Sequence, residues 1–204
     1  MVSKNSDKRG YAVRRKTFDV LISGVGALIV VVLLVAGGLL MWGYSFANSN
    51  VHNQLAEQQI TFPPRAAFAH AVPGTEITPG MIPYLEKYAG EPLTTGAQAE
   101  AYADHFIAVH LQEIGGGKSY AQLSSEAMAL PKGSAAYTAA EAKVQTVFQG
   151  TTLRGLLLEA YAFWQMGQIA LFASIACFAL AAVMLIFTIL GFVHMRRTPE
   201  GAEI

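Results

Sequence analysis

The chain has 204 residues, of which 53% are hydrophobic and 14% are charged, and its mean hydropathy is +0.37. This composition is apolar for a soluble domain of this size and favours a membrane protein. The single cysteine, Cys177, excludes a disulfide within one chain and any CxxC-type zinc or redox motif.

Residues 20–47 contain no Asp, Glu, Lys, Arg or His. About 20 apolar residues suffice to cross the hydrocarbon core of a bilayer, so we expect a transmembrane helix here. The alternative is a cleaved secretory signal, because Ser45, Phe46 and Ala47 imitate a small-x-small cleavage site. The apolar run is longer than the roughly 7–15 residues of a signal peptide core, which favours an uncleaved anchor.

Residues 164–193 form a second uncharged run and predict a second transmembrane helix. Residues 1–19 carry six basic and two acidic side chains, and Arg196 and Arg197 follow the second run. The positive-inside rule therefore predicts a multi-pass protein of the plasma membrane, with a cytoplasmic N-terminus (1–19) and a cytoplasmic tail (194–204). Trp42 and Trp164 agree, since each lies at the expected outer end of its span.

Small residues at four-residue spacing indicate that the two spans pack closely. They are Ser23, Gly24, Gly26 and Ala27 in the first span and Ala173, Cys177 and Ala181 in the second.

The segment 48–163 is predicted to be an extracytoplasmic helical domain, so the expected fold class is all-α. The first helix should continue to about Gln59, where prolines 63 and 64 stop it. Residues 61–77 read as an irregular strap. A short helix should follow, capped by Thr78, starting at Pro79 and ending near Gly90.

Two capping boxes predict the next helices. Thr95 and Gln98 open a helix that runs to about Ile114 and is closed by glycines 115–117. Ser119 and Gln122 open another that ends before Pro131. From Ser134 onward the helical pattern continues without a proline into the second span, with Gly150 and Gly155 as expected points of bending.

The helix over 96–114 holds the densest group of potential metal ligands, of which the candidates are His105, His110 and Glu113. His105 and His110 are five residues apart, about 140° around a helix, so they do not readily bind one metal. His110 also lies on an apolar stripe with Phe106 and Leu111, which is typical of a hydrogen-bonded core histidine. The pattern favours structural roles, and we expect no metal site or cofactor.

Other motifs for catalysis, transport or nucleotide binding do not occur. The sequence has no Gly-x-Ser-x-Gly, and residues 115–119 lack the glycine spacing and preceding strand of a phosphate-binding loop. Neither span contains a charged residue of the kind that marks ion or proton pathways. The segment 48–163 carries six basic and ten acidic residues, which excludes a basic surface for nucleic acid.

The most plausible contact surface lies within 151–167, where aromatic anchors accompany one cation at the expected membrane boundary. The candidate partner-binding residues are Arg154, Tyr161, Phe163 and Trp164. Their alternative role is anchoring at the lipid headgroups.

Residues 82–90, 94–110 and 151–167 resemble a family of actinobacterial two-span membrane proteins of unassigned function, and the likeness extends over nearly the whole chain. Members of that family are often labelled aromatic ring-opening dioxygenase. Enzymes of that type hold non-haem iron with two histidines and a carboxylate. This chain presents no such triad at a recognisable spacing, and we transfer no catalytic residue.

These observations favour a non-enzymatic integral membrane protein whose external helical domain binds a partner protein or ligand, in an accessory or scaffold role. Its expected partners are the lipid bilayer and a membrane or extracytoplasmic protein, and it could form a homo-oligomer. One alternative is a metal-dependent oxidoreductase of the ring-opening dioxygenase type, with iron. Another is an extracytoplasmic sensor that acts through a separate partner, because cytoplasmic segments of about 19 and 11 residues are too short for a transmitter domain.

Overall fold

The structure, a computed structural model, describes residues 15–197 and 199. It is 81% helical, and the described residues form no β-strand, so the predicted all-α fold is confirmed. The chain divides into two compact units. We call them the helix-pair unit, which comprises the described parts of 1–42 and 170–204, and the core unit, residues 43–169. Helices α1 (Arg15–Glu57) and α7 (Ala135–Arg197) contribute to both.

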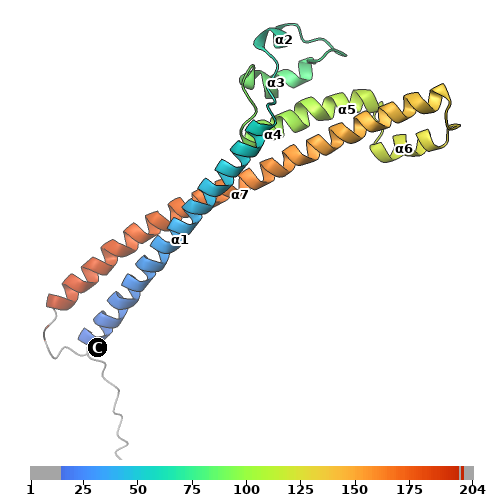
Figure 1. Cartoon of the computed structure of the whole chain (residues 1–204). Coiled ribbons are helices and arrows are strands. Elements are labelled where there is room, and N and C mark those ends of the chain that lie inside the picture. Colours follow the sequence, from blue (N-terminus) through green and yellow to red (C-terminus); the bar gives the residue numbers. More distant parts are fainter. Residues whose placement is uncertain (1–14, 198, 200–204) are drawn as a thin grey trace, which may run out of the picture. The chain divides into compact units, whose positions relative to one another are not determined.

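In the helix-pair unit, α1 and α7 run antiparallel and side by side (Figure 1). A Cβ atom built on Gly26 would lie 2.7 Å from the Oγ1 atom of Thr188, and one built on Gly191 would lie 2.6 Å from the Oγ atom of Ser23. The two backbones therefore approach closely only because small residues meet there.

The predicted close packing of the two helices through small residues is confirmed, but not every predicted residue lies at the contact. Ser23, Gly26 and Ala181 are buried, whereas a Cβ on Gly24 would meet nothing within 4 Å. Ala173 is only half-buried, and its neighbour Ser174 is fully buried instead.

Ser174 supplies a hydrogen bond between the two helices. Its Oγ atom donates to the carbonyl oxygen of Gly37 at 2.8 Å. The ring of Phe178 lies over the same glycine, so that a Cβ there would be 2.9 Å from the ring. A side chain at position 37 would therefore displace the ring of Phe178.

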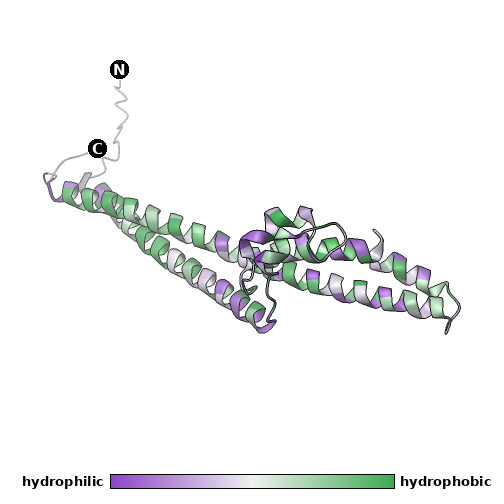
Figure 2. Ribbon diagram, turned by 90° about the horizontal axis from the view of Figure 1, so that it is seen from above, coloured by the Kyte–Doolittle hydropathy of each residue, from purple (hydrophilic) through white to green (hydrophobic). Residues whose placement is uncertain are grey.

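The helix pair exposes most of its large apolar side chains. Both helices are long and apolar enough to cross a membrane, and in their most apolar windows only 22% of α1 and 11% of α7 is buried. In the view of Figure 2, hydrophobic residues predominate along both helices in this unit, and many of the large ones are exposed. A helix that is hydrophobic all round is typical of a protein core or a membrane span, and the low burial excludes the first within this chain.

Helix α1 ends at Glu57, within two residues of the predicted end. Gln59 then takes a positive φ of 52°. Three backbone hydrogen bonds join residues 60–63 to residues 90–93: Phe62 donates to Glu91 (2.9 Å), Leu93 to Ile60 (2.8 Å) and Gly90 to Pro63 (3.0 Å). The prediction of an irregular segment over 61–77 needs one correction, since it contains the short helix α2 (Arg65–Ala69). This single turn starts directly after Pro64, whose fixed φ suits a helix start.

The predicted helix from Pro79 to Gly90 is three short pieces rather than one. They are the 3₁₀ turn η1 (Pro79–Met81), helix α3 (Ile82–Leu85) and the 3₁₀ turn η2 (Glu86–Tyr88). Thr78 has the extended backbone of an N-cap, but its side chain makes no capping hydrogen bond. Gly90 closes the segment with a φ of +76°, as its position predicted.

The predicted helix from 96 to 114 is present but contains a turn of π-helix. Its parts are α4 (Gly96–Tyr102), the π-helical η3 (Ala103–Ile107) and α5 (Ala108–Gly115). The Thr95–Gln98 capping box is confirmed, because the Gln98 amide nitrogen donates to Thr95 Oγ1 at 3.3 Å and Gln98 Oε1 accepts from the Thr95 amide at 3.0 Å. Gly116 ends α5 in the left-handed conformation.

The second capping box is also confirmed. Ser119 and Gln122 satisfy each other's backbone amides at the start of α6 (Tyr120–Met128). After it, α7 runs unbroken for 63 residues, so Gly150 and Gly155 do not interrupt it. Gly150 instead makes room for Leu111 of α5, since a Cβ there would lie 2.6 Å from that side chain.

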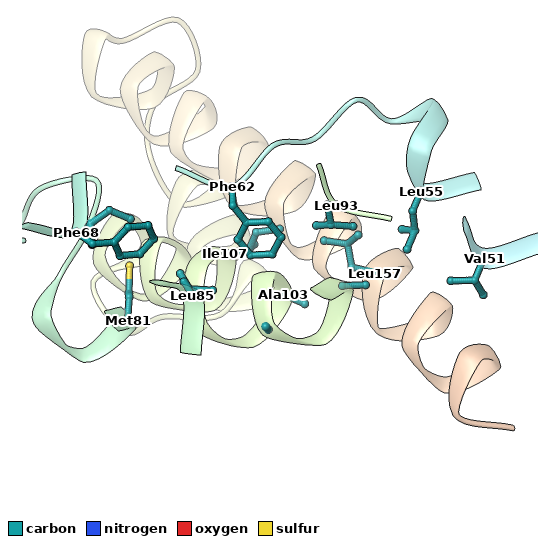
Figure 3. Close-up of a cluster of buried hydrophobic side chains, with 13 residues drawn as sticks. Val51, Leu55, Phe62, Phe68, Met81, Leu85, Leu93, Ala103, Ile107 and Leu157 are labelled. Carbon is teal, nitrogen blue, oxygen red and sulfur yellow. The ribbon is translucent and has the colours of Figure 1, made fainter. Parts of the chain in front are cut away.

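The core unit has a continuous apolar interior (Figure 3). Phe62 lies at its centre and contacts the rings of Tyr88 and Tyr102, at centroid distances of 5.2 and 5.4 Å. Leu157 brings α7 into this interior, and Val51 and Leu55 bring the end of α1. The two longest helices therefore pack against the same hydrophobic core as the short helices between them.

Candidate functional site

The π-helical turn places Asp104 and His105 in different surroundings. Asp104 accepts a hydrogen bond at 2.5 Å from the guanidinium of Arg154 on α7. The ring of His105 stacks on that of Tyr84, with centroids 3.4 Å apart and planes 5° from parallel. A π turn adds one residue to a helical turn and rotates the residues that follow it, and such turns are frequent at functional sites.

His110 and Glu113 follow the π turn and do not approach His105. His110 is half-buried, its Nδ1 atom lies 2.8 Å from the carbonyl oxygen of Phe106, and Glu113 is exposed. With Nδ1 donating to that carbonyl, Nε2 is the acceptor nitrogen of the ring. Among the described residues no three His, Cys, Asp or Glu side chains are grouped so as to hold a metal ion.

Tyr102 contributes a half-buried phenol to this helix. Burial raises the pKa of its hydroxyl above the ordinary value of 10.0, and the negative charge of Glu76 adds to the rise. Its ring packs against Phe62 and Phe106. The neutral phenol therefore belongs to the folded core at all physiological pH values.

The four candidate partner-binding residues do not share one surface. Arg154 is half-buried and its guanidinium pairs with Asp104. Trp164 packs against Gly96, where a Cβ would lie 2.3 Å from the Cβ of the tryptophan, and stacks with Tyr161 at 6.1 Å. Phe163 points to another side of α7. Partner binding by these residues stays a prediction, and each has an identified contact within the core unit.

Phe163 belongs to an open groove between α1 and α7 in the core unit, with a volume of about 530 Å³. Its ring makes an edge-to-face contact with Phe46, at a centroid distance of 6.4 Å. The α7 wall is mainly apolar and includes Leu153, Leu156 and Met166. Leu156 and Met166 are 59% and 58% exposed, which is high for large apolar side chains next to a core.

The opposite wall of the groove carries amides. Asn50 and Gln54 are four residues apart and therefore share one face of α1, and Gln58 lies in the turn that follows the end of α1 at Glu57. The lining contains no Lys, Arg or His, and Glu159 is its one carboxylate. The arrangement can bind an apolar ligand along α7 and hydrogen-bond uncharged polar groups along α1.

No protein-family model, curated protein or solved structure matches the chain. The resemblance to the actinobacterial family accordingly stays a prediction.

The residue pattern predicted only part of the apolar α7 wall of the groove. Phe163 was selected as a candidate, whereas the amides of Asn50, Gln54 and Gln58 were not. Their four-residue spacing was a usable signal, because it repeats with the helical period beside the apolar Val51 and Leu55.

Proposed function

We propose that the chain is an integral membrane protein, anchored by α1 and α7, whose core unit lies outside the cytoplasm and binds a partner protein or ligand. The observation that carries the membrane assignment is the exposed apolar surface of the helix-pair unit. Large exposed apolar surfaces are rare on soluble monomers and mark membrane or protein contacts.

The end of α1 supports an uncleaved anchor. Ser45, Phe46 and Ala47, which imitate a cleavage site, lie inside α1, and the helix continues for ten residues beyond them to Glu57. Ala47 is buried, and its Cβ would lie 3.0 Å from a Cβ at Gly167 of α7. Cleavage there would remove part of the packing of the core unit.

The orientation of the chain rests on its charges. Arg196 and Arg197 lie in the last turn of α7, and the positive-inside rule puts this end in the cytoplasm. The basic N-terminal cluster, of which Lys4 to Arg14 lie outside the described residues, puts the other end there too. The core unit, residues 43–169, would then face the outside.

Binding at the core unit is supported by the groove. Its volume lies within the roughly 300–1,000 Å³ of small-molecule sites, and its apolar wall is exposed. The groove, with its exposed apolar wall, is the feature that leads us to propose a binding role.

Labelling with a membrane-impermeant maleimide tests the arrangement. In a Cys177→Ala background, a cysteine replacing exposed Ser125 of α6 is expected to react in intact cells, and one replacing exposed His194 to react only after lysis. Extraction of the membranes at alkaline pH should leave the chain in the pellet. Release of the chain into the supernatant, or labelling of both positions in intact cells, would contradict the proposal.

A further inference from the structure

The groove in the core unit has the dimensions of a site for one long, thin ligand. Its lining on α7 extends from Leu153 to Met166, which is about 20 Å along a helix. A helix has a diameter of about 10–12 Å with its side chains, so a helix of that length fills about three times the volume of about 530 Å³. The groove therefore encloses a ligand thinner than a helix, whereas a helix would insert only part of its width.

The walls of the groove specify the chemistry of this ligand. Leu153, Leu156 and Met166 present aliphatic carbon along its length, and burial of such surface is favourable by about 25 cal/mol per Å². This length of apolar wall suits a hydrocarbon tail better than a peptide, whose backbone amides would need partners along the α7 wall.

The polar wall specifies the head of the same ligand. The amides of Asn50, Gln54 and Gln58 both donate and accept hydrogen bonds, and Glu159 accepts them or pairs with an amine. No Lys, Arg or His lines the groove, so a ligand carboxylate or a lipid headgroup of net negative charge would have no cationic partner there. Charge complementarity therefore favours a head that is uncharged or carries an amine.

We propose that the groove binds one acyl chain of a membrane lipid whose headgroup is zwitterionic or neutral. This inference rests on the proposed function, since the bilayer around α1 and α7 is the source of the lipid. It assigns the ligand of the core unit to a chemical class, and it gives the exposed Leu156 and Met166 a partner.

Photolabelling in reconstituted vesicles tests the proposal. The probe is phosphatidylethanolamine with a photoreactive diazirine in its acyl chain, and labelled peptides are mapped by mass spectrometry. We expect labels within 153–166 as well as in the helix-pair unit. Phosphatidylglycerol with the same tail should label the groove about fivefold less, because its net negative charge meets Glu159 and no cation.

Two groove variants sharpen the result. Ala160→Leu adds three carbons to the groove lining and should lower groove labelling about tenfold, whereas Ala142→Leu, on an exposed part of α7 outside the groove, should not. Leu156→Glu places a second carboxylate at an exposed position of the groove wall and should also lower groove labelling about tenfold. Phe148→Glu is its control. Labels in the helix-pair unit report that each variant is inserted in the membrane.

Each outcome distinguishes the two proposals. Labels in the helix-pair unit without labels in 153–166 would overturn the lipid site and leave the membrane assignment intact. An absence of labels from both would overturn both. Equal labelling of the groove in all variants, or a cross-link from the groove to a second copy of the chain, would overturn the lipid site.

Discussion

The two units of this protein use opposite ways of packing the same pair of helices. In the helix-pair unit the smallest residues face inward, as at Gly26 and Gly37, and the large apolar ones face outward. In the core unit large apolar residues of the two helices, such as Leu55 and Leu157, face inward. The surface of α1 and α7 therefore changes along the helices, from a surface suited to lipid in the helix-pair unit to one suited to water in the core unit.

The two units also differ in how their backbone polar groups are hydrogen-bonded. In the core unit the helix starts carry capping boxes at Thr95 and Ser119, which satisfy backbone amides that would otherwise need water. In the helix-pair unit the helices are long and continuous, so their backbone groups bond internally, and Ser174 bonds across to Gly37.

Substitution of Gly96 should show the largest effect. A Cβ at this position would lie 2.3 Å from the Cβ of Trp164, an atom fixed to the backbone of α7, so Gly96→Ala forces the two helices apart. We expect a loss of about 1–3 kcal/mol in the free energy of unfolding of the core unit. Guanidinium unfolding in mild detergent, followed by tryptophan fluorescence, measures it.

Gly155→Ala is the matched control for this substitution. A Cβ there meets nothing within 4 Å, and alanine is favoured over glycine in a helix by about 0.5–1 kcal/mol. Equal midpoints for Gly96→Ala and the unmodified protein would refute the close contact between α4 and α7.

A smaller effect is expected in the helix-pair unit. Ser174→Ala removes the hydrogen bond to the Gly37 carbonyl, and interhelical hydrogen bonds in membranes contribute about 0.6 kcal/mol on average. Unfolding equilibria in bicelles should show this loss, and Ser45→Ala, at an exposed position of α1, should show none. A loss exceeding that of Gly96→Ala would reverse the comparison between the two units.

The smallest effect is a pH dependence confined to alkaline conditions. The pKa of Tyr102 is raised in the folded state by burial and by Glu76, above the 10.0 of the unfolded chain. The unfolded state therefore loses this proton first, so the contribution of Tyr102 to stability is complete below pH 10 and is lost as pH rises through the folded pKa. Tyr102→Phe should flatten the alkaline limb of a stability–pH curve, and an unchanged limb would disprove the assignment to Tyr102.

Structural features that depend on residues close together in the sequence could be predicted from the sequence. The two apolar runs, the capping boxes at Thr95 and Ser119, and the helix ends near Gly90 and glycines 115–117 were all predicted from local patterns. Each rests on interactions within about four residues, or on the uniform requirement for apolar side chains in a span.

The tertiary structure alone decided the rest. The π turn at Ala103–Ile107, the contact of Gly96 with Trp164 and the bond from Ser174 to Gly37 were not predicted. The same holds for the groove, whose amide and apolar walls come from helices about 100 residues apart in the chain. The sequence determined that these helices form and how apolar they are, but which of their faces meet depends on the packing of side chains from distant segments.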